Sequence, residues 1–290
     1  MNIPKYWARA IETVRNPAGK TATFSCWQWS DVSAIDAKQK ASARAETLAW
    51  KLVNKEKLER YGYGARPMRE EICEGITNRK RNELGIVTRN GYGALILNAV
   101  NVMFIDIDFA PEKSGRQGGG LRGIIQRLLG QAPEPQPMSQ TEHHLQNIEQ
   151  WAASHQVGMR VYRTFAGLRC LVTNEVFDPT RQGSLDIMRE LQCDPLYVKL
   201  CQSQACFRAR LTPKPWRCGV RNPPSRYPWP NQAGEQKYRQ WQNTYTQAAS
   251  AFAVCRLVTQ LGSSRVHPDV KPILDFHDNV ACSGSDLRLA

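Results

Sequence analysis

Residues 94–110 read ALILNAVNVMFIDIDFA, and this stretch decides the fold that the sequence predicts. Two apolar runs flank a short segment with two asparagines, a pattern typical of a β-hairpin. Because side chains alternate along a strand, Asp106 and Asp108 are expected on one face, about 7 Å apart at their Cα atoms. Ile105 and Ile107 are expected on the other face, in a core. The stretch therefore predicts a strand that presents two carboxylates side by side.

The segments after this strand predict the order of the elements around it. Ser139 and Glu142 have the spacing of a capping box, so a helix is expected to begin there. Gly167 follows an alanine in a tight turn between two strands. The predicted strands are 102–109, 159–165, 168–174 and 205–212, in one antiparallel-rich sheet, and the predicted helices are 140–155 and 181–191, on one face. The order β-α-β-β-α-β is that of a split βαβ, the RRM-like or ferredoxin-like arrangement, within an α/β (α+β) protein.

Two further parts are expected on either side of this core, which spans residues 93–213. Residues 1–92 are predicted to be mostly helical, because residues 36–60 contain helix formers throughout and neither Gly nor Pro, and a second helix is expected over 68–84. Residues 214–290 begin with a loop rich in proline and tryptophan and continue with a helix and a tail of short strands and turns. Helices are expected over 36–60 and 68–84 and a short strand over 21–29 in the first part, and a helix over 235–261 in the last part. A further short helix is expected over 121–129, within the core.

The composition limits the classes of protein that the chain can belong to. Hydrophobic residues make up 41% of 290 residues, which is enough for a packed core. Nine cysteines are an odd number and form no regular framework, so reduced thiols and a cytoplasmic location are expected. There is no signal-peptide pattern and no apolar run long enough for a membrane span. The formal net charge of +13 favours a polyanionic partner, and nucleic acid is the commonest one.

The carboxylate pair predicts a metal site. Asp106 and Asp108 on a rigid strand suit a hard divalent cation such as Mg²⁺ or Mn²⁺, which commonly bridges phosphates in nucleotidyl transfer. By the same alternation, arginines are expected beside them on an open face, where guanidinium forks bind phosphate oxygens. The predicted nucleotide- or phosphate-binding residues are Arg169, Arg208, Arg210 and Thr164. The alternative is that Asp–Arg pairs across the strands only hold the sheet together.

The apolar run that ends in D-x-D, the helix after it and the hairpin RVYRTFAGLR resemble the catalytic core of archaeo-eukaryotic-type primases and primase-polymerases. The resemblance covers about a hundred residues and implies an RRM-like fold with the aspartate pair on one strand. The second motif of these enzymes has a nucleotide-contacting histidine, and here Arg169 stands in that place. The third motif has an acidic residue on a later strand, and the predicted strand 205–212 has none.

Other candidate sites are weaker. The dipeptide His277-Asp278 offers a metal ligand or a general base. Residues 216–229 combine Trp, Pro and Arg, which suits stacking on single-stranded bases or, equally, a packed loop. A group of cysteines offers a structural zinc site but contains no C-x2-C pair, and core thiols are the alternative. These cysteines are Cys193, Cys201, Cys206 and Cys218.

The leading hypothesis is therefore a primase-like, divalent-metal-dependent nucleotidyltransferase or nucleotide-processing protein that acts on nucleic acid or a nucleoside triphosphate. The first alternative is a non-catalytic nucleic-acid-binding protein with a degenerate primase-like fold, which would bind in a salt-sensitive way without metal. The second is a sugar-nucleotide transferase that uses D-x-D, although no doubly wound βαβ series precedes the motif.

Overall fold

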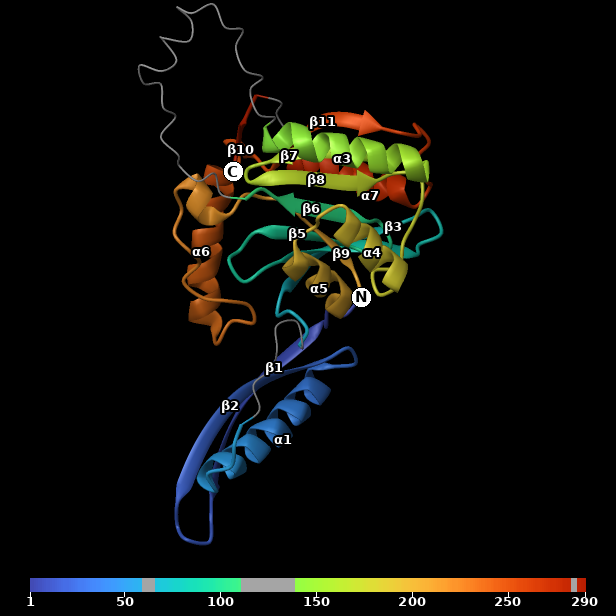
Figure 1. The fold of residues 1–290 in the computed structure, drawn as a ribbon. Helices are drawn as coiled ribbons and strands as arrows, with labels where there is room; N and C mark the ends of the chain where they lie inside the picture. Colours follow the sequence, from blue (N-terminus) through green and yellow to red (C-terminus); the bar gives the residue numbers. More distant parts are fainter. Residues whose placement is uncertain (59–65, 111–138, 283–285) are drawn as a thin grey trace, which may run out of the picture.

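The chain folds as a mixed α+β protein in two structural units, a small N-terminal one and a larger body (Figure 1). The computed structural model describes residues 1–58, 66–110, 139–282 and 286–290. Within these ranges no helix combines the length and the apolar composition needed to cross a bilayer. The predicted helix over 121–129 lies outside the described residues.

The N-terminal unit is a β-hairpin covered by one helix. Strands β1 (Tyr6–Arg15) and β2 (Thr21–Ser30) pair in antiparallel fashion, and α1 (Ala34–Val53) lies against both. The helix begins after Ser33, whose side chain accepts a hydrogen bond from the Asp36 backbone N–H at 3.1 Å. Small side chains at every fourth position let the helix lie close to the strands. The fully buried residues of this stripe are Ala37, Ala41, Ala45 and Ala49.

The first sheet of the body contains two strands that the sequence did not predict. Its order is β3-β4-β5-β9, formed by β3 (Glu71–Thr77), β4 (Glu83–Arg89), β5 (Leu95–Ala99) and β9 (Phe207–Arg210). Strands β3 and β4 replace the helix predicted over 68–84, and residues 1–92 are therefore not mostly helical. The turn between them is closed by Asn78, whose side chain accepts hydrogen bonds from the backbone of Lys80 and Asn82.

The second sheet holds the D-x-D strand. Its order is β11-β7-β8-β6, formed by β11 (Cys255–Leu261), β7 (Met159–Thr164), β8 (Gly167–Val172) and β6 (Phe104–Asp108). Strands β5 and β6 do not form the predicted hairpin, because each belongs to a different sheet. Strand β9 likewise pairs with β5, so only three of the four predicted core strands share a sheet.

One tyrosine joins the two sheets where β6 and β9 lie next to each other. The Tyr197 hydroxyl lies 2.7 Å from the Arg208 carbonyl oxygen and 3.2 Å from the Phe104 carbonyl oxygen. It also accepts a hydrogen bond from the Arg208 N–H at 3.1 Å. The two strand edges are thus connected through a side chain and do not form a ladder of their own.

Helices cover both faces of the second sheet (Figure 1). Helices α3 (Gln140–His155) and α4 (Gln182–Glu190) lie on one side, as predicted, and are linked by the 2.9 Å hydrogen bond from Trp151 Nε1 to Glu190 Oε2. The predicted capping box of Ser139 and Glu142 is confirmed. Helix α7 (Val270–Ala281) covers the opposite side, in a segment where only strands and turns were expected.

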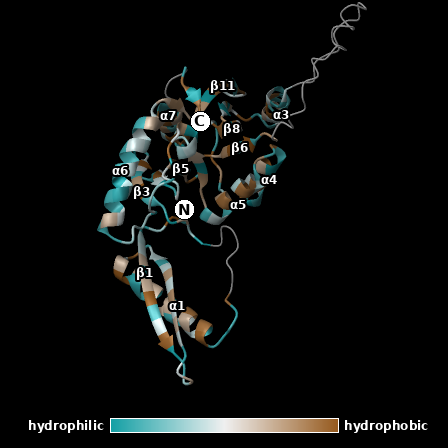
Figure 2. Ribbon diagram, turned by 90° about the vertical axis from the view of Figure 1, so that its left-hand side faces the viewer, coloured by the Kyte–Doolittle hydropathy of each residue, from teal (hydrophilic) through white to brown (hydrophobic). Residues whose placement is uncertain are grey.

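The remaining elements are α5 (Pro195–Gln204), the 3-10 helix η1 (Pro215–Cys218) and α6 (Gln232–Ala249). Helix α6 is largely hydrophilic and lies at the edge of the body (Figure 2). It ends twelve residues before the predicted end at residue 261, because β10 (Phe252–Ala253) and β11 follow. Strand β10 pairs in parallel with β12 (Arg288–Leu289) close to the C-terminus.

Candidate functional site

One cleft of about 730 Å³ lies where β6 and β8 of the second sheet meet β9 of the first. The structure brings together in this cleft all the site residues that the sequence singled out, although they come from four strands. These residues are Asp106, Asp108, Thr164, Arg169, Arg208 and Arg210.

The aspartate strand follows the predicted alternation. Asp106 and Asp108 point towards the cleft, and Ile105 and Ile107 are buried on the other side of β6. The β7–β8 turn packs tightly against the end of this strand, since a Cβ atom at Gly167 would lie 1.8 Å from the Ile107 carbonyl oxygen. Only glycine permits this approach, which fixes the backbone beside the two carboxylates.

The two aspartates have different surroundings. Asp106 forms a two-pronged ion pair with Arg169, with 2.8 Å from Nε to Oδ1 and 3.3 Å from Nη2 to Oδ2. Asp108 is exposed, and within the described residues its carboxylate has no salt bridge. Partial burial and the nearby carboxylates of Asp106 and Asp194 raise the pKa of Asp108. A bound cation would relieve this repulsion.

Asp194 is a third carboxylate of the cleft that the sequence did not reveal. It caps helix α5, since its Oδ1 accepts a hydrogen bond from the Leu196 N–H at 3.0 Å. Its own backbone N–H donates to the Asp106 carbonyl oxygen at 3.0 Å, which ties the start of α5 to the aspartate strand. An aspartate before a proline is a helix-start signal, but its position beside Asp106 depends on tertiary structure.

Two of the predicted phosphate-binding arginines are buried and engaged, so the face expected to be open is partly covered. Arg169 is 1% exposed and also donates from Nη1 to the Arg210 carbonyl oxygen at 2.9 Å. Arg208 donates from Nη2 to both carboxylate oxygens of Glu70, at 2.8 and 2.9 Å, and Glu70 is 2% exposed. Their guanidinium groups therefore already form ion pairs with carboxylates of the protein.

Three other cationic side chains face the carboxylates. Arg210, Lys214 and Arg217 line the cleft, and only Arg210 was predicted. Burial and then the charges of Arg210 and Arg217 lower the pKa of Lys214. Burial and then Arg210 lower the pKa of Arg217 in the same way. The charged forms of Lys214 and Arg217 are thus destabilised by burial and by neighbouring cations, Asp108 offsets part of this effect, and a bound anion would offset more of it.

Several donor atoms of the cleft lack an acceptor. Arg210 Nε, Arg217 Nη1 and Arg208 Nη1 are buried, and none has a hydrogen-bond acceptor among the described residues. A buried guanidinium donor without a partner is costly, and an oxygen-rich anion in the cleft would supply acceptors.

Aromatic side chains form the outer part of the cleft. Tyr92 and Trp216 stand edge to face with ring centroids 5.4 Å apart, and Trp216 is 53% exposed. Lys214 Nζ lies 5.5 Å from the Trp216 centroid. The KPWR segment, which places basic residues around a tryptophan, is the sequence signal for this surface. Thr164, 9% exposed, lines the inner part from the end of β7.

The predicted cysteine group does not form a metal site. Within the described parts of the chain, the only three metal-capable side chains whose ligand atoms lie within 4.8 Å of one another are Cys255, His277 and Cys282. Burial raises the pKa values of the Cys193, Cys201 and Cys206 thiols, as expected for core cysteines. His277 is fully buried under the second sheet, away from solvent.

The cleft thus combines four carboxylates, of which Glu70 is buried against Arg208, with arginines that have unsatisfied donors and an aromatic pair. Comparisons of the chain with protein-family models, with curated proteins and with solved structures find no match.

Proposed function

We propose that the cleft binds a divalent cation with a nucleoside triphosphate or a nucleic-acid phosphate, and that it serves nucleotidyl transfer of primase-like type. The observation that carries the proposal is the pairing of two electrostatically strained groups in one cleft. At one side, burial and the carboxylates of Asp106 and Asp194 raise the pKa of Asp108. At the other side, burial and neighbouring cations lower the pKa values of Lys214 and Arg217, and the charge of Asp108 offsets only part of this effect. A complex of a metal ion with a polyphosphate would stabilise both groups at once.

The residues present fit a Mg²⁺ or Mn²⁺ ion. Hard cations of this kind prefer carboxylate oxygens, and burial followed by the carboxylates of Asp106 and Asp194 raises the pKa of Asp108 although Lys214 and Arg210 act in the opposite direction. Asp106 and Asp108 would hold the ion in this proposal. When bound, the ion supplies charge neutralisation for the phosphates that react.

The side chains of the protein have separable roles in this proposal. Arg169 fixes the orientation of Asp106 through its two-pronged pair and is a positioning residue. Arg210, Lys214 and Arg217 bind phosphate oxygens in this proposal, and Arg210 Nε and Arg217 Nη1 are buried donors without another acceptor among the described residues. Trp216 offers an exposed ring for stacking on a base.

The arrangement of the core supports the primase-like reading in part. The elements β6, α3, β7, β8 and α4 follow the order of the split βαβ, and β6 lies beside β8 in the sheet. The last strand, β9, lies next to β6 but pairs with the first sheet. The proposed similarity to the primase-like fold therefore concerns strands β6, β7 and β8 together with helices α3 and α4.

Nucleotide binding tests the proposal directly. Calorimetric titration with a nucleoside triphosphate, with and without Mg²⁺, is expected to give metal-dependent binding to the parent protein and none to Asp108→Asn. Asp275→Asn is the matched control, because Asp275 is an exposed aspartate paired with Lys271 on α7. Transfer of a labelled nucleotide to single-stranded DNA or RNA then tests catalysis. Equal nucleotide binding with and without the metal ion would refute the proposal.

A second candidate function is nucleic-acid binding without catalysis. It is favoured by the ion pair of Asp106 with Arg169, which already engages one of the two carboxylates, and by the net charge of +13. The N-terminal unit adds a cleft of about 390 Å³ lined by tryptophans, where the Arg69 guanidinium lies 5.2 Å from the Trp27 centroid. This function predicts single-strand binding that weakens steeply with salt and needs no metal ion.

A further inference from the structure

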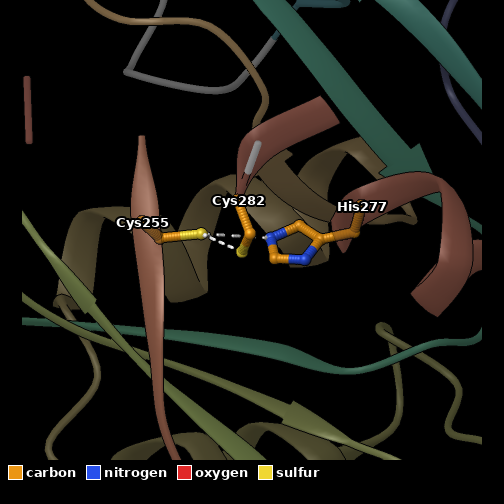
Figure 3. A group of neighbouring side chains, drawn as sticks. All are labelled: Cys255, His277 and Cys282. Atoms are coloured by element: carbon orange, nitrogen blue, oxygen red, sulfur yellow. Dashed lines mark hydrogen bonds between the residues drawn. The ribbon is translucent and has the colours of Figure 1, made fainter. Parts of the chain in front are cut away.

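A second group of reactive side chains lies behind the cleft, under the second sheet. Cys255 begins β11, Cys282 follows the last turn of α7, and His277 lies on α7 itself. Figure 3 shows the three side chains converging from these elements. The Sγ atoms of Cys255 and Cys282 are 3.2 Å apart, and Cys255 Sγ is 3.9 Å from His277 Nε2.

The backbone holds the two thiols together. The Val254 N–H donates to the Ala281 carbonyl oxygen at 3.1 Å, so the residues directly before the two cysteines are hydrogen-bonded. Beyond Cys282 the chain returns to pair β12 with β10, next to the start of β11. The proximity of the two sulfur atoms is therefore set by the fold of the C-terminal segment.

The imidazole of His277 is oriented towards the sulfur atoms by a carboxylate. Asp278 Oδ1 lies 3.0 Å from His277 Nδ1 and also accepts a hydrogen bond from the Tyr162 hydroxyl at 2.8 Å. Asp278 is held in turn by an ion pair with Arg160. With Nδ1 donating to the carboxylate, Nε2 is the acceptor atom of the ring, and it lies 3.9 Å from Cys255 Sγ and 3.4 Å from Arg169 Nη1. A histidine that ligates a metal ion usually donates its other N–H in this way.

We propose that Cys255, His277 and Cys282 together bind one Zn²⁺ ion. Two sulfur donors and one imidazole are the ligands that zinc prefers. At Zn–S and Zn–N distances of about 2.3 and 2.0 Å, ligand atoms of a tetrahedral site are roughly 3.5–3.8 Å apart. The two thiols would therefore need to separate by only about half an ångström from their present distance. Cys282 is half-buried, so a water molecule can reach the fourth position from its side.

The charge balance allows such an ion in a buried place. Arg169 Nη1 lies 3.4 Å from His277 Nε2, but Asp106 compensates the guanidinium charge. Zn²⁺ with two thiolates and a neutral imidazole has no net charge, so it adds little repulsion next to Arg169.

A disulfide between the two cysteines is the competing explanation for their proximity. It would require the sulfur atoms to approach to about 2.05 Å. The oriented histidine and its carboxylate have no part in a disulfide, whereas both are features of a zinc site. The proposal concerns a structural ion and is independent of the function of the cleft.

Metal analysis of the full chain, purified under reducing conditions and without chelators, tests the proposal. We expect one zinc ion per chain in the parent protein and in Cys73→Ser, which changes an exposed thiol on β3. Cys282→Ser is expected to reduce bound zinc at least about tenfold, because a zinc site needs at least three protein ligands. Titration with Co²⁺ should give thiolate charge-transfer absorption in the parent and in Cys73→Ser only.

A second measurement needs no variant and so does not depend on their folding. Zinc is expected to protect Cys282 from alkylation, read out by peptide mapping, while Cys73 of the same molecules remains reactive. A parent protein that takes up no zinc after reconstitution under reducing conditions would overturn the proposal. So would retention of zinc by a folded Cys282→Ser variant, or a Cys255–Cys282 disulfide that excludes the metal ion.

Discussion

Replacing Asp106 by asparagine removes the carboxylate that holds the buried Arg169 guanidinium. Removing one partner of a buried ion pair costs about 3–5 kcal/mol, because the other charge remains buried. Asp106 keeps 31% of its side chain exposed, so we expect the lower end of this range, about 3 kcal/mol. For a chain of this length that corresponds to a fall in Tm of about 6 °C.

The same substitution two residues further along the strand should behave differently. Asp108 has no salt bridge among the described residues, and neighbouring carboxylates raise its pKa. Removing its charge as Asp108→Asn should leave the free energy of unfolding unchanged or raise it by less than about 1 kcal/mol.

Urea denaturation of both variants, followed by circular dichroism with divalent cations chelated, measures this difference. Chelation separates the stability of the fold from any stabilisation by a bound metal ion. An equal loss of stability in the two variants, or a loss below about 1 kcal/mol for Asp106→Asn, would refute the assignment of distinct roles.

Three further outcomes follow from the cleft. Glu70→Gln leaves Arg208 buried without its carboxylate and should lower the free energy of unfolding by about 3–5 kcal/mol in urea denaturation; a loss below 1 kcal/mol would contradict the pairing. Lys214→Gln relieves repulsion within the cation group, so stability should hold or rise slightly, while calorimetry should show about tenfold weaker triphosphate binding, or 1.4 kcal/mol. Trp216→Ala removes an exposed ring and should weaken single-strand binding by about 1–3 kcal/mol in fluorescence anisotropy, with an unchanged Tm. Unaltered binding in either of these last two variants would contradict the proposed roles.

The sequence predicts well those features that depend on local periodicity. The alternation in FIDID places both aspartates on one face, and the Ser139 and Glu142 spacing gives the start of α3. Each of these signals lies within a few residues, so no knowledge of distant partners is needed.

Features that depend on distant partners could not be predicted in this way. Residues 68–84 contain helix formers, but Glu70 pairs with Arg208, 138 residues away, and β3 pairs with β4. The break between α6 and β10 lies at Ser250 and Ala251, and no Gly or Pro marks it. The burial of Arg169 could not be predicted for the same reason. Alternation of side chains gives the face of β8 on which Arg169 lies, but not that helix α7 packs against this face.

Strands β6 and β9 meet along a seam between the two sheets that has no backbone ladder and is bridged by Tyr197. A ladder between β6 and β9 would lock the edges with a hydrogen bond at every second residue. The Tyr197 hydroxyl and the Arg169 guanidinium, both side-chain groups, connect the edges instead. Side chains tolerate small changes of angle that a ladder does not. Because the carboxylates of β6 stand on one side of this seam and Arg210 of β9 on the other, a shift of the sheets would change the distance between the two charge groups.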